Sequence, residues 1–156
     1  MKPHIRWLIR HDMEEVLAIE LEAFGELGWN EQDFLSMLRQ RITIGMVVDI
    51  EDHVRGYMIY DLAKAELVVH NFVVQKCCQR EGIGSAMVDK LKSKLSSHRR
   101  TGITMSVPET NLDALLFFRS QGFLATGILR DDYEGPCGPE DGIAMAYCLP
   151  ELVEAP

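Results

Sequence analysis

The residue types best suited to chemistry lie in one short segment, residues 79–86 (QREGIGSA), where two glycines stand two positions apart. An apolar, β-branched run of strand length precedes it at 67–74. After it, apolar residues recur at 83, 87, 88, 91 and 95, which is helical spacing on one face. Glycine allows turn conformations that a Cβ would obstruct. The segment is therefore predicted to join a buried strand to a helix and to leave bare amide N–H groups at the helix start, where the helix dipole favours phosphate oxygens.

A strand, a glycine loop and a helix also occur as a purely structural turn, and that interpretation stays open beside the phosphate-binding one. Two nucleotide-binding patterns are excluded. The Gly-Lys-Ser/Thr that a P-loop needs at the helix start is missing, and Met87 stands where a dinucleotide fingerprint has its last glycine or alanine. The pattern that remains is Gln-x-x-Gly-x-Gly.

The composition is that of one globular domain. A chain of 156 residues, 47% hydrophobic and 26% charged, is large enough to bury roughly 70% of its unfolded surface without help from disulfides or metal sites. The net charge of -8 argues against a nucleic-acid-binding surface and is compatible with a cationic acceptor. No apolar run approaches the ~20 residues that span a membrane, and no secretory signal precedes the four cysteines, so we expect a cytoplasmic protein with reduced thiols. The cysteines lack zinc-site spacing, and no metal is expected.

The order of the predicted elements indicates an α/β (α+β) domain, with one central mixed sheet of about six or seven strands flanked by about four helices. We expect a single domain over 1–156, with an ordered core at about 4–150 and a short C-terminal tail. Strands are predicted at 5–9, 43–50, 54–62, 67–74, 103–107, 123–130 and 143–149, with a hairpin turn at 51–53 and a loop at 134–142.

Local signals also place the helix ends. Asp12 and Asn30 are expected to cap the first two helices, and Thr110-Asn111-Leu112-Asp113 resembles a capping box that opens the last one. Gly122 is expected to end that last helix. The apolar residues expected inward are Met13, Val16, Leu17, Leu21 and Phe24 in the first helix, Phe34, Leu35 and Leu38 in the second, and Leu115, Leu116, Phe117 and Phe118 in the last.

Two motifs carry a resemblance to a known family. Residues 79–84 resemble the acyl-CoA pyrophosphate motif of the GNAT superfamily of N-acyltransferases, and 111–123 (NLDALLFFRSQGF) resemble the GNAT segment Asn-x-x-Ala-x-x-x-Tyr-x-x-x-Gly-Phe. Three further pieces, 29–31 with Phe34, 129–133 and 140–145, are similar to the ribosomal-protein-alanine N-acetyltransferase branch, called RimI in bacteria, and to related N-terminal acetyltransferases. The resemblance implies the GNAT fold and acetyl-CoA as cosubstrate.

The resemblance also implies which residues contact the coenzyme. The backbone of Phe72, Val73 and Val74 would bind the pantetheine arm, and Asn111 would hydrogen-bond the coenzyme near its thiol end. The residues that would cradle or flank the pyrophosphate are Gln79, Arg80, Glu81, Gly82, Ile83, Gly84, Ser85 and Ala86. The structural alternatives are a core strand for 72–74, a surface position for Arg80 and a helix cap for Asn111.

The catalytic positions depart from the family pattern. Ser106 stands where RimI-like enzymes carry a strand-borne glutamate base, and Phe118 stands where a tyrosine is expected to protonate the leaving thiolate. We keep Ser106 as a catalytic candidate and Phe118 as a coenzyme contact. His70 and Glu109 are the substitutes considered, because both lie near the expected site and imidazole suits a base at neutral pH. His70 also resembles a histidine on the same strand of serotonin-type arylalkylamine acetyltransferases, and a packed strand histidine is its alternative.

Four residues are candidates for the acceptor side. By the resemblance, Tyr133 matches one tyrosine of a paired-tyrosine substrate loop, and Asp132 replaces the other with an acid that could pair with a cationic substrate. Leu27 and Trp29 are expected to form the acceptor wall, with plain packing as the alternative. Keeping a protein N-terminal amine neutral at pH 7 costs about 1 kcal/mol, whereas a lysine amine costs about 4.6 kcal/mol. Weak acid–base provision therefore favours the N-terminal amine.

We therefore expect acetyl transfer from acetyl-CoA to a primary amine, with a protein N-terminal α-amine favoured, by direct attack in a ternary complex. Two alternatives stay open: a small-molecule amine acetyltransferase with His70 as base, and an acyl-CoA-binding module that has lost catalysis. The expected partners are acetyl-CoA and the amine acceptor, without nucleic acid or membrane, and the protein is expected to be a monomer or a homodimer.

Overall fold

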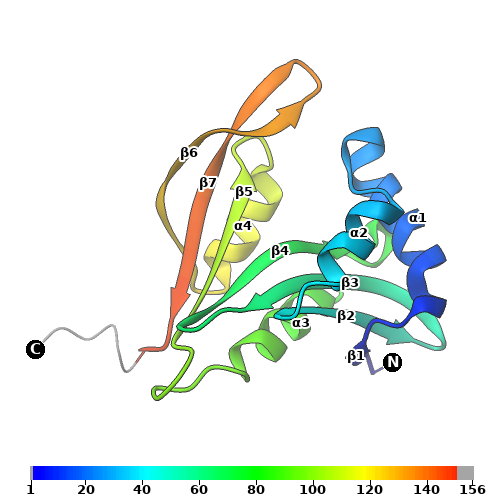
Figure 1. Ribbon diagram of the computed structural model, residues 1–156, viewed down its shortest axis with the longest axis horizontal. Coiled ribbons are helices and arrows are strands. Elements are labelled where there is room, and N and C mark those ends of the chain that lie inside the picture. The colour runs from blue at the N-terminus through cyan, green and yellow to red at the C-terminus, as the bar shows by residue number, and fades with distance from the viewer. Residues whose placement is uncertain (1, 151–156) are drawn as a thin grey trace, which may run out of the picture. The chain divides into compact units, whose positions relative to one another are not determined.

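The computed structural model describes residues 2–150, and Figure 1 shows the order of their elements. The helices in this range are α1 (Met13–Phe24), α2 (Glu31–Leu38), α3 (Ile83–Lys92) and α4 (Leu112–Ser120). The strands are β1 (His4–Trp7), β2 (Thr43–Ile50), β3 (His53–Leu62), β4 (Glu66–Val74), β5 (Gly102–Pro108), β6 (Leu124–Gly135) and β7 (Gly138–Cys148). Short 3-10 helices lie at Arg10–Asp12, Gly25–Leu27 and Lys76–Cys78.

The strands follow the order β1-β2-β3-β4-β5-β7-β6. β4 and β5 run parallel, whereas the pairs β1–β2, β2–β3, β5–β7 and β6–β7 are antiparallel. The predicted fold class, one mixed sheet of six or seven strands with about four helices, is confirmed. None of the helices between residues 2 and 150 combines the length and the apolar character that crossing a bilayer requires.

Contacts group the described residues into two compact units, one of residues 2–62 with 70–90 and one of 63–69 with 91–150. The division falls within β4, whose first four residues belong to the second unit. The single domain stays a prediction, and the predicted C-terminal tail lies outside the described residues.

In the first unit, α1 and α2 pack on β2, β3 and β4. Their shared core is Met13, Val16, Ile19, Phe34, Val47, Val54, Tyr57, Ile59 and Val73. Strand alternation turns the neighbouring residues of β3 the other way. There a Cβ on Gly56 would lie 3.3 Å from Met87 Sδ of α3 and 3.0 Å from the Val73 carbonyl oxygen. The absence of a side chain at Gly56 therefore lets α3 pack close to β3.

The inward face of α1 differs from the prediction in its second half. Leu21 and Phe24 are 62% and 40% exposed, and Ile19 and Glu20 are buried in their place. Apolar spacing alone did not identify Glu20, because a carboxylate is rarely buried without partners. Its partners come from distant parts of the first unit, and they are described with the site below.

Asp12 stands at the N-cap of α1, but its carboxylate makes no cap hydrogen bond there, so the predicted role is wrong. It accepts hydrogen bonds from the Arg6 guanidinium at 2.8 Å and from the Ile9 N–H at 2.9 Å. β1 accordingly ends at Trp7 rather than at residue 9. Burial acts to raise the pKa of Asp12, but the hydrogen bonds from Arg6 and Ile9 outweigh it, and this pKa lies below its ordinary value.

Two other turn signals are confirmed. Asn30 caps α2, since its side chain accepts from the Asp33 N–H at 2.9 Å. Glu51 and Asp52 join β2 to β3, and both have positive φ (53° and 69°), as a two-residue type I′ hairpin requires.

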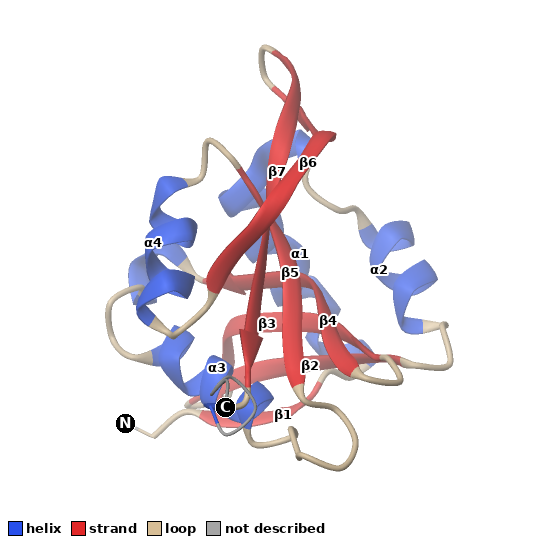
Figure 2. Ribbon diagram, turned by 90° about the vertical axis from the view of Figure 1, so that its left-hand side faces the viewer, coloured by secondary structure: helices blue, strands red, loops and turns tan. Residues whose placement is uncertain are grey.

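In the second unit, β5 pairs with the first part of β4 and with β7. β6 and β7 form a hairpin longer than predicted, drawn as a twisted ribbon in Figure 2, with only residues 136–137 between them. The predicted loop at 134–142 is therefore wrong: residues 134–135 end β6, residues 138–142 belong to β7, and the turn is confined to 136–137. The register of the two strands shifts between Leu129 and Tyr133, which makes residues 130–132 a bulge.

α4 is capped by Asn111 alone. Its Oδ1 accepts from the Ala114 N–H at 3.2 Å, while the Thr110 hydroxyl donates to Glu140 at 2.7 Å instead of closing a capping box. Phe118 is the buried member of the predicted apolar cluster, and Leu116 is 53% exposed. Gly122, with φ of 95°, ends the helix as predicted.

Candidate functional site

The glycine segment connects β4 to α3 through two residues with positive φ, Arg80 (66°) and Gly82 (85°). The Ala86 N–H donates to the Gly82 carbonyl oxygen at 3.0 Å, and the amides of Ile83 and Gly84 lie in the first turn of α3, where a helix offers no carbonyl one turn earlier. Gly84 lies inside α3 with ordinary helical backbone. Only Gly82 therefore needs the conformational freedom of glycine, and a Cβ there would meet no atom within 4 Å.

The remaining residues of this segment divide between solvent and core. Arg80 and Glu81 are exposed, and Ile83 is buried and anchors the helix start. Exposed Gln79 donates from Nε2 to the Val74 carbonyl oxygen at 3.1 Å, which ties the loop back to the end of β4. A loop that presents amides and a guanidinium at a helix N-terminus can bind an anion such as a pyrophosphate.

β4 continues well beyond its pairing with β5. The parallel register runs from Glu66 opposite Gly102 to Val69 opposite Met105, and β4 then extends to Val74. In this extension Val73 is buried in the core of the first unit, and Phe72 and Val74 are half-buried. The side chain of Val73 is thus used for packing, and only its backbone remains for a ligand.

His70 belongs to a hydrogen-bonded series on three neighbouring strands. Its Nε2 lies 2.8 Å from Asp61 Oδ2, and Asp61 Oδ1 accepts from the Thr43 hydroxyl at 2.6 Å. Burial acts to raise the pKa of Asp61, but the hydrogen bonds from Thr43 and His70 outweigh it, so the pKa lies below its ordinary value and the carboxylate is ionised at neutral pH. The alternative prediction was that His70 is a packed strand residue, but its side chain is partly exposed and has a carboxylate partner in Asp61.

In the second unit, Ser106 of β5 and Asp132 of β6 meet across β7. The Ser106 hydroxyl donates to Asp132 Oδ2 at 2.8 Å, and the Tyr133 hydroxyl donates to the Ser106 carbonyl oxygen at 2.8 Å. The strand between them presents Gly142, where a Cβ would lie 2.5 Å from Ser106 Oγ and 2.8 Å from Asp132 Oδ2. Ser106 is therefore a donor that holds a carboxylate. Burial raises the pKa of Tyr133, and its phenol stays protonated.

The bulge that carries Asp132 is fixed by Asp141. Asp141 accepts from the Asp131 N–H at 2.9 Å and from the Arg130 guanidinium at 3.1 Å. Asp131 itself has a φ of 52°. Glu109, a predicted base, lies on the other side of Asp141: its N–H donates to the Asp141 carbonyl oxygen, and its carboxylate is 3.5 Å from the Asp141 amide nitrogen. The contacts of Glu109 with Asp141 thus join the end of β5 to β7.

Two predicted coenzyme contacts have structural roles of their own. Asn111 is the N-cap of α4 through Oδ1, which leaves its Nδ2 as the donor for a ligand. Phe118 is 5% exposed, and its ring lies 5.0 Å from that of Phe117 and 5.4 Å from that of Phe123. The Phe118 ring is therefore buried by packing against the rings of Phe117 and Phe123.

The predicted acceptor wall between α1 and α2 is held by Glu20. Its carboxylate accepts from the Trp29 N–H at 2.8 Å and Asn71 Nδ2 at 2.9 Å, and also from the Tyr57 hydroxyl. The Trp29 ring packs edge-on to Phe34 at 5.1 Å. Leu27 is 56% exposed. Of the two predicted wall residues, Leu27 is the more exposed, and Trp29 is half-buried against the core of the first unit.

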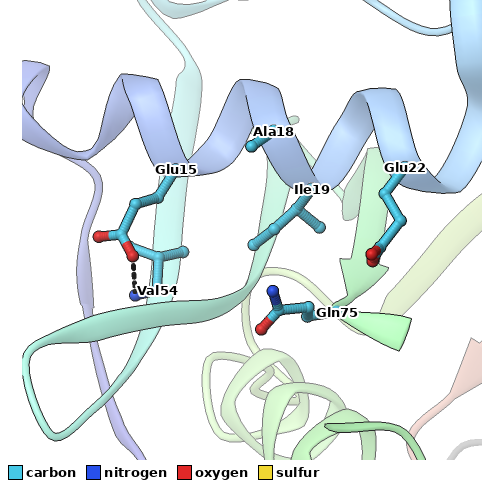
Figure 3. Close-up of a pocket in the computed structure, with 6 residues that line it drawn as sticks. All are labelled: Glu15, Ala18, Ile19, Glu22, Val54 and Gln75. Atoms are coloured by element: carbon cyan, nitrogen blue, oxygen red, sulfur yellow. Dashed lines mark hydrogen bonds between the residues drawn. The ribbon is translucent and has the colours of Figure 1, made fainter. Parts of the chain in front are cut away.

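Two hollows lie in the first unit, and neither contains a predicted site residue. One, of about 180 Å³, lies between α1 and β3, as Figure 3 shows, and is lined by Glu15, Ala18, Ile19, Glu22, Val54 and Gln75. Its two carboxylates disfavour an anionic ligand. The other, of about 460 Å³, is lined by Leu8, Ile9, Arg10, Met13, Glu31, Leu35 and Leu38.

Sequence reasoning missed four residues that organise these groups: Thr43, Asp61, Glu20 and Gly142. An acid at the end of an apolar strand run, as in 57–62 (YMIYDL), is a weak signal for Asp61. Gly142 lies in the segment 140–145, but nothing local indicates its role, because that role depends on side chains from two other strands.

Residues 41–124 match the family model described as an acetyltransferase (GNAT) domain. The ribosomal protein bS18-alanine N-acetyltransferase of Salmonella typhimurium is 25% identical over 135 residues, which cover 86% of this chain and 90% of that protein. The crystal structure of the Escherichia coli ribosomal-protein-S18-alanine N-acetyltransferase is similar with a TM-score of 0.83 at 24% identity, over 95% of this chain and 94% of that one. Arabidopsis thaliana NAA60 in complex with acetyl-CoA is similar with a TM-score of 0.78 at 13% identity, over 94% and 98%. At these identities the structural likeness shows the fold.

Proposed function

Because the chain belongs to the GNAT acetyltransferase family, we propose that it transfers the acetyl group of acetyl-CoA to the α-amine of a protein N-terminus. The family match covers more than half of the chain and includes parts of both compact units, which supports one catalytic domain. Membership confirms the family resemblance drawn from the motifs at 79–84 and 111–123, and the protein is an N-acetyltransferase. The acceptor class is the proposed part.

The observation that carries the proposal is the start of α3. The loop there holds Arg80 and Gly82 at positive φ, and the amides of Ile83 and Gly84 lie in the first turn of the helix, where helical amides face away from the chain. We assign the coenzyme pyrophosphate to this loop and the pantetheine arm to the backbone of β4 from Phe72 to Val74. The Asn111 amide would donate near the thioester.

Direct attack by the amine is favoured over an acyl-enzyme. Burial and contact with Cys77 raise the pKa of the Cys78 thiol, which keeps it protonated and weakly nucleophilic at neutral pH. In direct attack the amine nitrogen bonds to the thioester carbon, the C–S bond breaks, and CoA leaves as a thiolate. The proton lost by nitrogen goes to a base, and we assign this role to His70, which lies on β4 two residues before the backbone assigned to the pantetheine arm.

The acceptor side supports a cationic substrate. Asp132 is exposed, and only its Oδ2 is used by Ser106, so Oδ1 can accept from a substrate ammonium or amide. Tyr133 is fixed beside it with its hydroxyl on the Ser106 backbone. The relative from Salmonella is an alanine N-acetyltransferase of a ribosomal protein, and a protein N-terminal amine also needs the smaller deprotonation free energy.

The test is calorimetric titration with CoA, followed by acetyl-CoA turnover measured as release of free thiol. The acceptors are an alanine-starting ribosomal peptide, a polyamine, an arylalkylamine and an aminoglycoside. We expect the peptide to be preferred. Turnover of only the small amines would show a small-molecule acetyltransferase, and CoA binding without any turnover would show a binding module.

Gly82→Ala tests the loop against a matched control. Gly82 and Gly138 both have positive φ (85° and 116°) and open space around a Cβ, but only Gly82 is in the loop. Left-handed backbone costs alanine about 1–2 kcal/mol. CoA affinity should therefore fall about 5- to 30-fold in Gly82→Ala and stay unchanged in Gly138→Ala. Equal affinities for the two variants would contradict the assignment.

A further inference from the structure

The side chains of Thr43, Asp61 and His70 form a continuous hydrogen-bonded series across β2, β3 and β4. Thr43 and Asp61 are direct register partners, and the two hydrogen bonds, 2.6 Å and 2.8 Å, use one oxygen each of the Asp61 carboxylate. Thr43 is 8% exposed, while the side chains of Asp61 and His70 are 21% and 31% exposed. The series thus runs from a buried anchor to an accessible ring.

The series determines the state of the imidazole. An ionised carboxylate can only accept hydrogen bonds, so the His70 nitrogen that faces it, Nε2, must carry a proton. A neutral ring with Nε2–H has its lone pair on Nδ1. The carboxylate cannot rotate away easily, because Thr43 holds its second oxygen. The ring is therefore fixed in one tautomer, with its basic nitrogen on the side away from Asp61.

A structural role alone does not explain this arrangement well. Partly exposed ion pairs contribute little to stability, because solvent screens them and both side chains lose freedom. A carboxylate that orients an imidazole and stabilises its protonated form is, in contrast, a known way to make histidine an effective base.

We propose that Asp61, anchored by Thr43, is a positioning residue for the transfer reaction and holds His70 with Nδ1 ready to accept the proton of the attacking amine. The inference rests on the proposed function. As the N–C bond forms and the C–S bond breaks, the nitrogen proton moves to Nδ1, directly or through one water. The resulting imidazolium donates from Nε2 to Asp61, and the CoA thiolate takes its proton from solvent.

The central variant is Asp61→Asn. The asparagine amide can donate to Nε2, which would move the ring proton to Nδ1 and occupy the basic position. We expect kcat to fall by about 10²-fold, as for loss of a general base, with unchanged CoA affinity. Combining Asp61→Asn with His70→Gln should lower kcat no further than His70→Gln alone. Thr43→Val, which keeps the carboxylate but loses its anchor, should lower kcat less than 10-fold.

A second readout does not depend on turnover. Two-bond ¹H–¹⁵N correlation spectra identify the protonated nitrogen of each of the five histidines, with His70→Gln giving the assignment. We expect Nε2–H in the native protein and Nδ1–H in Asp61→Asn. Asp49→Asn is the matched control, since Asp49 is a strand aspartate that accepts from Arg6 at 3.2 Å and does not contact His70.

The outcomes separate this inference from the proposed function. If the native protein fails to bind CoA or to acetylate any amine, the proposed function fails, whatever the tautomer. If it binds and turns over, but Asp61→Asn keeps the native tautomer or the native kcat, the positioning role is overturned. A kcat loss of the same size in Asp49→Asn would overturn it as well. Circular dichroism of each variant confirms that it is folded.

Discussion

Replacing Gly142 with alanine puts a methyl group where the structure has no room for one. The new Cβ would lie 2.5 Å from Ser106 Oγ, 2.8 Å from Asp132 Oδ2 and 3.1 Å from Tyr133 Cε2. The two oxygens are side-chain ends and can move apart, but they then lose the 2.8 Å hydrogen bond between them. The substitution therefore targets the contact that joins β5 to β6 across β7.

The expected cost follows from that contact. A hydrogen bond to a charged group contributes about 1.5–3 kcal/mol, and the exposure of Asp132 places this one at or below the low end of that range. Crowding of the Tyr133 ring adds to it, so we expect a loss of about 2 kcal/mol in the free energy of unfolding. At an m-value of about 2 kcal/mol per molar urea, the unfolding midpoint falls by about 1 M. The KM for the acceptor should rise as well, with CoA affinity unchanged.

Urea unfolding followed by circular dichroism measures the effect, and Gly127→Ala is the control. Gly127 lies in β6 without positive φ, and a Cβ there meets nothing within 4 Å, so alanine should be neutral or slightly stabilising. In an Asp132→Ala background, the cost of Gly142→Ala should fall by about 1 kcal/mol, because one of the crowded atoms is gone. If Gly142→Ala is as mild as Gly127→Ala, or if its cost is the same in both backgrounds, the reasoning is refuted.

Two further predictions concern the first unit. The pKa of Asp12 is lowered in the folded protein, so this carboxylate stabilises the fold above its unfolded pKa of 3.8, and that stabilisation is lost as the pH falls through the folded pKa. The urea concentration at the unfolding midpoint should therefore decrease when the pH is lowered below about 4, and it should decrease less steeply in Arg6→Met. If the urea midpoint changes with pH as steeply in Arg6→Met as in the native protein, the role assigned to the Arg6–Asp12 pair is contradicted. Glu20→Gln turns one acceptor oxygen into a donor among the Trp29 and Tyr57 donors, and should lower the free energy of unfolding by about 3 kcal/mol in the same assay. A loss below 1 kcal/mol would show that the cluster rearranges freely.

What could be predicted from sequence is local in origin. The strand, loop and helix around residues 79–86 follow from apolar periodicity and glycine spacing, and the Asn30 cap and the hairpin turn at Glu51 and Asp52 follow from the preferences of single residues. Each depends on a few neighbouring positions, and each agrees with the structure.

What could not be predicted depends on register between distant segments. Ser106 and Asp132 are 26 positions apart, and Thr43 and Asp61 are 18 apart, so no local pattern links them. The inward face of α1 was mistaken for a related reason: Glu20 is buried only because its partners come from other elements. Ser106 stood out in the sequence as a missing carboxylate, and the structure brings a carboxylate to it from another strand.

The bulge at residues 130–132 also affects how copies of this protein behave in concentrated solution. β6 is the last strand in the sheet order and is exposed along most of its length, with Leu124 at 68% and Ile128 at 57%. A straight, regular strand in that position would offer a row of open hydrogen-bonding groups to a second molecule. The bulge interrupts this row with three consecutive charged residues on a distorted backbone. The same bulge that carries Asp132 toward β5 therefore also discourages edge-to-edge aggregation.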